Sequence, residues 1–132
     1  MIFKIKSGAS KSGTTKFTFD GKNLKLGASS SSKTICNFDS LKIKQGNSSS
    51  GKALYYYDGK NIRQGGSASG KILFNVERNK VRQTGSSSGK ILFNFDRNKI
   101  REGSSLSGKI IYNYDDGIPE VILALIALGL LE

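Results

Sequence analysis

The sequence predicts an all-β domain in which six hairpin repeats close into a barrel or flower-like ring around a buried C-terminal helix. Three observations predict it. A repeat of 19 residues runs through residues 2–115, six units long, without insertion or deletion. Apolar side chains recur at every second position inside each unit. An unbroken apolar run, residues 121–131, follows the last unit. The length of 132 residues suits one domain, 1–132.

Each repeat begins with a first strand, of which Lys-Ile-Leu-Phe-Asn-Val-Glu from Lys71 is a clear example. A spacing of two between apolar residues is typical of a strand with one buried face. Ile72 and Val76 therefore share the inward face, whereas Asn75 and Glu77 point the other way. We expect the Asn, Asp, Lys and Arg positions to face water.

The inward positions form three columns, each with a spacing of 19. Their members are Phe17, Cys36, Tyr55, Phe74, Phe93 and Tyr112; Phe19, Phe38, Tyr57, Val76, Phe95 and Tyr114; and Ile5, Leu24, Ile43, Ile62, Val81 and Ile100. These columns are predicted to line the inside of the ring.

A turn and a second strand follow each first strand. Asp20-Gly21 and Asp96-Arg97-Asn98 supply Gly or Asn, which tolerate the positive φ of tight hairpin turns. Gly-Ser segments then lead to the next unit, and two of their positions are Ser in all six repeats. Loop chemistry is the favoured interpretation of these serines, and a ligand-binding rim of hydroxyls is the alternative.

The two ends of the repeat region predict ring closure. The chain starts in a second strand, residues 2–6, and ends in a first strand, residues 109–115. Pairing them would complete the sixth hairpin and remove the exposed edges of an open sheet, although an open array remains the alternative. Twelve strands would enclose a lumen. The apolar segment at 118–131 is predicted to fill or cap it as a helix beginning near Pro119. Its apolar run is too short to span a membrane, and an anchor is the less favoured reading.

Three families resemble this pattern. The unit Lys-Ala-Leu-Tyr-Tyr-Tyr-Asp-Gly-Lys, residues 52–60, resembles the short β-hairpin repeats of bacterial β-flower proteins. It also resembles the choline-binding-type repeats, although it lacks their Trp. Twelve strands around a C-terminal apolar helix are similar to the tubby-like architecture. The tubby-like resemblance would imply binding to phosphorylated lipid headgroups, but no tubby site residue has a counterpart here.

Composition excludes several kinds of catalytic and metal site. The chain has no His and one Cys, so it lacks Ser-His-Asp machinery, imidazole metal sites and an internal disulfide. The carboxylates recur with the repeat, as turn residues do. We therefore expect no enzyme and no cofactor, with a carboxylate-dependent hydrolase as a remote alternative. The N-terminus has no signal-peptide pattern, so a cytoplasmic location is expected.

Net charge gives the functional hypothesis. The chain carries 21 basic and 10 acidic residues, a formal charge of +11. One cationic column recurs in the second strands, and a Lys column begins most first strands. The candidate anion-binding residues are Lys6, Lys25, Lys44, Arg63, Arg82 and Arg101, together with Lys33 and Lys52. Such a field favours anionic partners, whereas the simpler interpretation is that exterior strand positions are polar.

The sequence thus predicts a non-enzymatic binding module for anionic ligands or surfaces, such as phospholipid headgroups, polyanions or non-specifically bound nucleic acid. A structural or accessory domain that binds another protein is the alternative. Sequence-specific recognition of nucleic acid is not expected, because nearly all the aromatic residues fall in core columns. Ligand identity and oligomeric state stay open.

Overall fold

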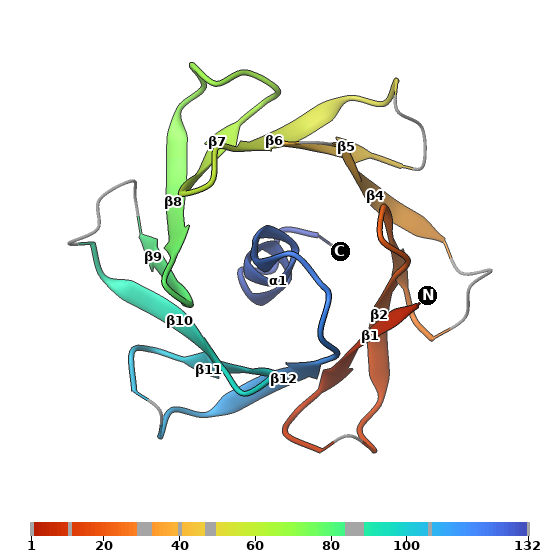
Figure 1. The fold of residues 1–132 in the computed structure, drawn as a ribbon, viewed down its shortest axis with the longest axis vertical. Helices are drawn as coiled ribbons and strands as arrows, with labels where there is room; N and C mark the ends of the chain where they lie inside the picture. The colour runs from red at the N-terminus through yellow and green to blue at the C-terminus, as the bar shows by residue number, and fades with distance from the viewer. Residues whose placement is uncertain are drawn as a thin grey trace.

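A computed structural model describes residues 2–10, 12–28, 33–39, 41–46, 50–83, 89–105 and 107–131. The strands run in a closed ring around a single helix on the ring axis (Figure 1). The elements are β1 (Phe3–Ser7), β2 (Thr15–Phe19), β3 (Asn23–Leu26), β4 (Thr34–Asp39), β5 (Lys42–Gln45), β6 (Ala53–Tyr57), β7 (Asn61–Gln64), β8 (Ile72–Glu77), β9 (Lys80–Gln83), β10 (Ile91–Asp96), β11 (Lys99–Glu102), β12 (Ile110–Tyr114) and α1 (Glu120–Ala127).

The predicted closure of the ring is confirmed. β1 pairs antiparallel with β12, and the register places Ile5 opposite Tyr114 and Ser7 opposite Tyr112. Every other strand pairs with its sequence neighbours, so the ring is an up-and-down barrel. The first and last strands thus form the sixth hairpin without a covalent turn, and the sheet has no open edge.

The ring alternates two kinds of strand pair. Within a hairpin, such as β8–β9, the register is continuous. Each of the six pairs joined by a Gly-Ser segment, such as β7–β8, contains a register shift. A bulge bends a strand and increases its twist. A bulge at each junction between repeats therefore directs the chain into the next hairpin, which gives the flower-like outline in Figure 1.

The hairpin turns explain the Gly and Asn positions of the repeat. Arg78 and Asn79 have φ of 54° and 64°, and Arg97 and Asn98 repeat this geometry. Two successive residues with positive φ match the twist of a two-residue hairpin turn. Asn tolerates this region, whereas Arg adopts it against its own preference.

The inward columns form the core. Ile5, Leu24, Ile43, Ile62, Val81 and Ile100 are completely buried. The aromatic columns and Cys36 are buried or half-buried against the same cluster. Helix α1 occupies the centre, with its residues from Val121 to Ile126 all buried. The prediction of an apolar helix inside the ring is therefore confirmed.

The helix is shorter than the predicted span of 118–131. Pro119 is its N-cap residue, and the helix ends because Gly129 adopts φ of 74°. The amide of Gly129 donates to the carbonyl of Ile126, and that of Leu130 donates to the carbonyl of Leu125. This pair of bonds is a Schellman C-cap. The remaining chain returns Leu131 to the core, where it is 2% exposed.

The expectation that the Asn column faces water is wrong. Asn37, Asn75, Asn94 and Asn113 point away from the ring axis, yet they are 0%, 2%, 3% and 7% exposed. The Nδ2 of Asn94 donates to the carbonyls of Gly103 and Ser105, and that of Asn113 to those of Gly8 and Ser10. The segments that follow the second strands thus fold back over the outer wall, and buried amides satisfy their carbonyls.

Candidate anion-binding surface

The cationic column lies on the outer wall of the ring, along the second strands. All six members, Lys6, Lys25, Lys44, Arg63, Arg82 and Arg101, are half-buried. They alternate with the fully buried aliphatic column, as the strand periodicity requires. The second strands are spaced around a closed ring, one to a repeat. The six residues are therefore distributed around its circumference and do not converge on one site.

The arginines of this column bind the Gly-Ser segments. The Nη1 atoms of Arg63, Arg82 and Arg101 donate to the carbonyls of Gly70, Gly89 and Gly108 at 3.0, 3.2 and 3.3 Å. Each acceptor lies seven residues further along the chain. These three guanidinium groups therefore fasten each segment to the preceding strand, a structural role that the sequence pattern did not reveal.

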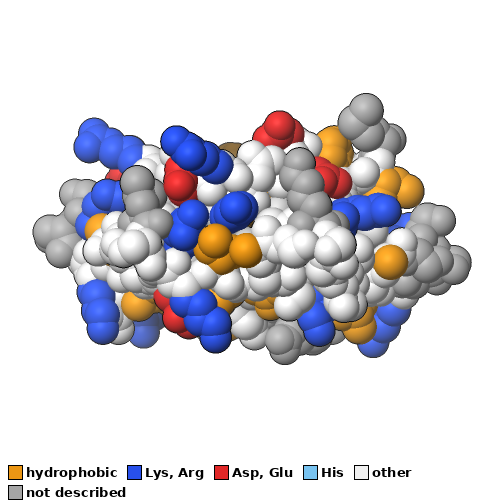
Figure 2. Space-filling model, turned by 90° about the horizontal axis from the view of Figure 1, so that it is seen from below, with side chains coloured by type: hydrophobic (Ala, Val, Ile, Leu, Met, Phe, Trp, Pro, Cys, Tyr) orange, Lys and Arg blue, Asp and Glu red, His pale blue; other side chains and the backbone are white. Residues whose placement is uncertain are grey.

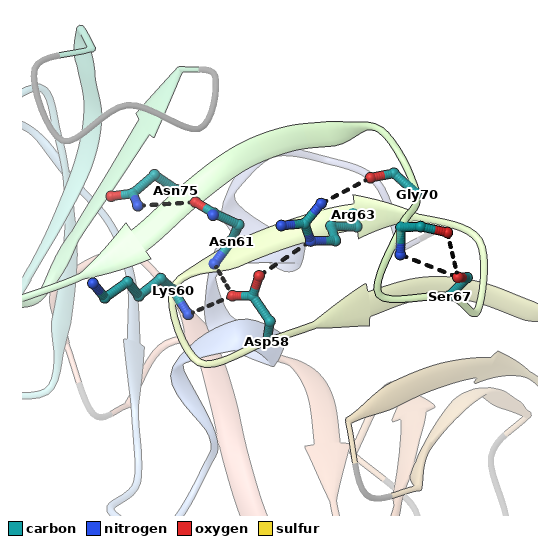
Figure 3. Close-up of polar contacts among 8 residues, drawn as sticks. Asp58, Lys60, Asn61, Arg63, Ser67, Gly70 and Asn75 are labelled. Carbon is teal, nitrogen blue, oxygen red and sulfur yellow. Dashed lines mark hydrogen bonds and ion pairs between the residues drawn. The ribbon is translucent and has the colours of Figure 1, made fainter.

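Arg63 also joins a loop to a hairpin turn, as Figure 3 shows. Its Nε donates to Asp58 Oδ2 at 3.1 Å, forming an ion pair. The other carboxylate oxygen, Asp58 Oδ1, accepts from the amides of Lys60 and Asn61 at 3.0 and 2.8 Å. Asp20 accepts from Lys22 and Asn23 in the same way. The interpretation of the acidic column as turn chemistry is confirmed at these two positions.

The turn aspartates have lowered pKa values. Burial alone would raise the pKa of Asp58, but the two backbone amides and the Arg63 guanidinium outweigh it. The pKa of Asp20 is lowered likewise: burial opposes the shift, while the amides of Asn23 and Lys22 and the charge of Lys25 produce it. A carboxylate whose pKa is depressed on folding stabilises the fold above its unfolded pKa, and this contribution is lost as the pH falls through the folded value.

Replacing Asp58 is therefore expected to have a pH-dependent cost. Asp58→Ala removes two amide hydrogen bonds and the ion pair, and should destabilise the protein by about 1–2 kcal/mol at pH 7. The difference from wild type should shrink as the pH falls below the ordinary Asp pKa of 3.8, because Asp58 is protonated first in the unfolded chain and then, at its lowered pKa, in the folded protein. Urea denaturation at pH 7 and pH 2.5 measures both values. A difference that is equal at the two pH values would contradict the assignment.

The second Lys column lies at a different place, where the first strands begin. Lys33, Lys52, Lys71, Lys90 and Lys109 are all exposed, and each precedes a first strand by one residue. Lys16, in β2, is exposed as well. We call this side of the ring, with residues 128–131 of the chain, the loop end. We call the opposite side, formed by the hairpin turns and residues 115–120, the turn end.

Contacts at the two termini of α1 show in which direction the helix runs through the ring. Leu130 and Leu131, beyond the helix C-terminus, line a hollow with Lys33 and Gln45 at the loop end. At the helix N-terminus, Asp116 accepts a hydrogen bond from the turn residue Asn98 at 2.9 Å. The helix therefore runs from the turn end to the loop end.

Charge is distributed unequally between these ends. By sequence position, the turn end holds eight acidic residues and eight basic ones, so it has no net charge: Asp20, Asp39, Asp58, Glu77, Asp96, Asp115, Asp116 and Glu120 against Lys4, Lys22, Lys42, Lys60, Arg78, Lys80, Arg97 and Lys99. Among the described residues, the loop end has the six lysines and one acid, Glu102. Figure 2 shows the molecule edge-on: Lys and Arg side chains project from both its upper and its lower edge, whereas most of the acidic side chains in this view lie in the upper half.

The exposed lysines of the loop end differ from Arg63 in their ion pairing. Within the described ranges, the side chains of Lys33, Lys52, Lys71 and Lys90 form no ion pair. Of the eight candidate residues, Lys33 and Lys52 lie on the loop end with three further lysines of their column. These lysines are also distributed around the ring, one to a repeat, so they share a face without converging on one site. The six residues of the wall column lie outside this face.

The loop end also contains an apolar hollow of about 360 Å³. Leu26, Ile35, Leu54, Leu130 and Leu131 line it beside Lys33 and Thr34. Leu26 and Leu130 are 49% and 39% exposed, although both are large apolar side chains. Ile35 and Leu54 are the extra residues of the bulges between β3 and β4 and between β5 and β6. The sequence signal for Leu26 is an apolar residue in a column that otherwise carries Gln, Glu or Ser, and it was not used to predict the site. Leu130 lies outside the repeat, in the apolar run that was predicted to be buried, so its exposure corrects that prediction.

The two Ser columns bond with each other in the described loops. Ser10 and Ser12, Ser67 and Ser69, and Ser105 and Ser107 have Oγ atoms 2.7, 2.9 and 2.7 Å apart. In each pair the second amide donates to the first hydroxyl. This local bonding supports the loop interpretation in these three repeats. Ser29, Ser31, Ser48, Ser86 and Ser88 lie outside the described residues.

Three further titratable groups with shifted pKa values lie in the core or beside it. Cys36 is fully buried, and burial raises the pKa of its thiol to about 12. Burial, followed by the charge of Glu120, raises the pKa of both Tyr57 and Tyr114 to about 12. Within the described ranges, no three residues of the His, Cys, Asp and Glu types lie close enough together to hold a metal ion.

Comparison with known proteins adds one match. A family model described as a 6-fold beta flower protein matches residues 5–126. No curated protein and no solved structure matches the chain. In the part of the chain that the structure describes, no helix has the length and apolar character needed to cross a membrane.

Proposed function

Because the chain belongs to the 6-fold beta flower family, we propose that its ring acts as a scaffold for a non-enzymatic binding module, which contacts anionic partners through the loop end. The observation that supports this proposal is the segregation of charge. Five exposed lysines of one column, with Lys16, lie on the side of the ring where Glu102 is the one described acid.

The loop-end lysines are better placed for binding than the wall column. Lys33, Lys52, Lys71, Lys90 and Lys109 are exposed, and a neighbouring acid does not neutralise them within the described ranges. Like charges held on a rigid ring focus a positive field on one face. The wall column adds to the field at longer range, while its arginines hold loops in place.

Charge reversal separates the two ends of the ring. The triple variant Lys52→Glu, Lys71→Glu, Lys90→Glu is expected to lower affinity for a soluble polyanion, inorganic polyphosphate, by at least about 100-fold at low salt. The salt dependence of binding should also become shallower, by on the order of three phosphate contacts. Titration of polyphosphate at 20–300 mM salt, followed by fluorescence anisotropy, measures both effects.

The turn end offers a matched control. The variant Lys4→Glu, Lys22→Glu, Lys60→Glu makes the same change of net charge with three exposed lysines. It should lower affinity far less, because the charges lie on the opposite side of the ring. Equal losses in the two variants would contradict a face-specific contact. Absence of wild-type binding at 20 mM salt to polyphosphate and to every other anionic probe would overturn the proposed function.

A further inference from the structure

Exposed apolar side chains lie at both ends of the ring, but they combine with uncompensated charge at one end. Ile2 and Leu41 are 48% and 44% exposed and flank turn-end residues, where basic and acidic residues balance. Leu26 and Leu130 are 49% and 39% exposed and lie beside Lys33 at the loop end. The loop end is therefore both cationic and apolar.

The apolar groups at the loop end lie beside the exposed lysines of that end. Leu130 follows the axial helix, and it lines the 360 Å³ hollow with Ile35 and Leu54. A second hollow at the same end is lined by Ala127, Ile110 and Ile111, with Lys16 and Lys109 beside them. In both hollows, apolar side chains lie next to exposed lysines.

We propose that the loop end docks face-on onto an anionic lipid bilayer, with Leu26 and Leu130 entering the apolar layer and the exposed loop-end lysines contacting the headgroups. This inference rests on the proposed function and names its partner. Charge complementarity is the argument: basic residues near an anionic membrane each raise the affinity about fivefold. A soluble polyanion satisfies the lysines but leaves the exposed leucines in water, whereas a bilayer covers both.

The ring geometry suits docking on a surface without insertion of the fold. Helix α1 is eight residues long and buried within the ring. The strands pair around the closed ring, so the backbone is already hydrogen-bonded. The contact therefore consists of side chains at one end, which resembles interfacial attachment by apolar groups and basic residues.

A fluorescent probe can test insertion directly, because the chain contains no Trp. The variant Leu130→Trp should show a blue-shifted emission with vesicles containing 30% phosphatidylglycerol, and no shift with phosphatidylcholine alone. Leu41→Trp, at the turn end, is the control and should not respond. Equal shifts at the two positions, or no shift at Leu130→Trp while the protein sediments with the vesicles, would overturn face-on insertion.

Polar substitution completes the test. The double variant Leu26→Ser, Leu130→Ser should lose about tenfold or more in vesicle affinity and bind polyphosphate like wild type. The matched control Ile2→Ser, Leu41→Ser should change neither. Circular dichroism checks the folding of these variants and should match wild type, because the substituted positions are exposed.

The outcomes distinguish the two proposals. Wild-type binding to polyphosphate without binding to anionic vesicles would overturn the docking inference and leave the proposed function intact. Tighter binding to a single-stranded oligonucleotide than to vesicles at equal salt would overturn it in favour of nucleic acid. Tighter binding to an acidic protein surface would do so in favour of a protein partner. Binding to none of these probes would overturn both proposals.

Discussion

Deletion of residues 119–132 is expected to abolish cooperative unfolding of the ring. Val121, Ile122, Leu123, Leu125 and Ile126 are between 0% and 3% exposed at its centre. Burying side chains of this size contributes about 1.5–3 kcal/mol each, so these five contribute about 10 kcal/mol. Small domains have a total stability of about 5–15 kcal/mol, and the helix therefore accounts for most or all of it.

The same deletion uncovers the inward columns. Ile5, Ile62 and Val81, which are completely buried in the intact ring, would border an open lumen. We expect a broad thermal transition by circular dichroism, with strong binding of the dye ANS, as in compact states that have lost their packing. A truncated protein with a sharp transition near the wild-type temperature would contradict the central role of α1.

Single substitutions in the C-terminal segment test the same prediction at a buried and at an exposed position. Leu125→Ala leaves a cavity at a fully buried site and should cost about 2–5 kcal/mol. Leu130→Ser, five residues further on, changes a side chain that is 39% exposed and should stay within about 0.5 kcal/mol of wild type. Chemical denaturation of the two variants compares an inward with an outward residue of the same C-terminal segment. Similar losses would show that the segment is not packed as described.

Gly70→Val is expected to destabilise the protein by about 3 kcal/mol or more. A Cβ atom at Gly70 would lie 2.2 Å from the carbonyl oxygen of Gln64, a backbone atom that cannot rotate away. Gly13 and Gly108 have the same close contact, with the carbonyl oxygens of Ser7 and Glu102. Relief of the clash requires moving the loop, which breaks the hydrogen bond from Arg63 to the Gly70 carbonyl.

The same loop supplies the control for Gly70. Ala68 is exposed and two residues away, and Ala68→Ser should change stability by less than about 0.5 kcal/mol. The double variant of Gly70→Val with Arg63→Lys tests the coupling: once the loop has moved, loss of the guanidinium should cost less than in wild type. Urea denaturation measures these three variants and Arg63→Lys alone, which completes the cycle. A Gly70→Val protein as stable as Ala68→Ser would contradict the close backbone approach.

Much of the fold could be predicted because the repeat averages over six copies of one local pattern. Period-two apolar positions and Gly or Asn turns specify hairpins by local sterics. The strand phase at each terminus predicted the pairing of β1 with β12, which the structure confirms. The apolar segment predicted a buried helix. The residue at which the helix ends was not predicted, because it depends on the C-cap at Gly129.

The outward positions were predicted less well. Strand alternation says which way Asn94 points but not what covers it, and its burial depends on a loop that returns over the wall. Arg101 looked like a solvent-facing cation and instead donates to the Gly108 carbonyl. Both contacts join residues 7–11 positions apart through the geometry of a loop, which a column of identical residues does not encode.

Local periodicity and the need to pair strand edges were enough to predict the period, the hairpins, the inward columns, the closing strands and the apolar helix. Which cations lie exposed on one face depends instead on how the ring folds. Curvature at the six bulges and the direction of the axial helix bring Leu26, Leu130 and the loop-end lysines to one side of the ring. The turns bring acids and bases together on the other side. The net charge of +11 says nothing about where the charges lie. Closure of the ring creates the loop end and the turn end, between which the charges are then distributed unequally.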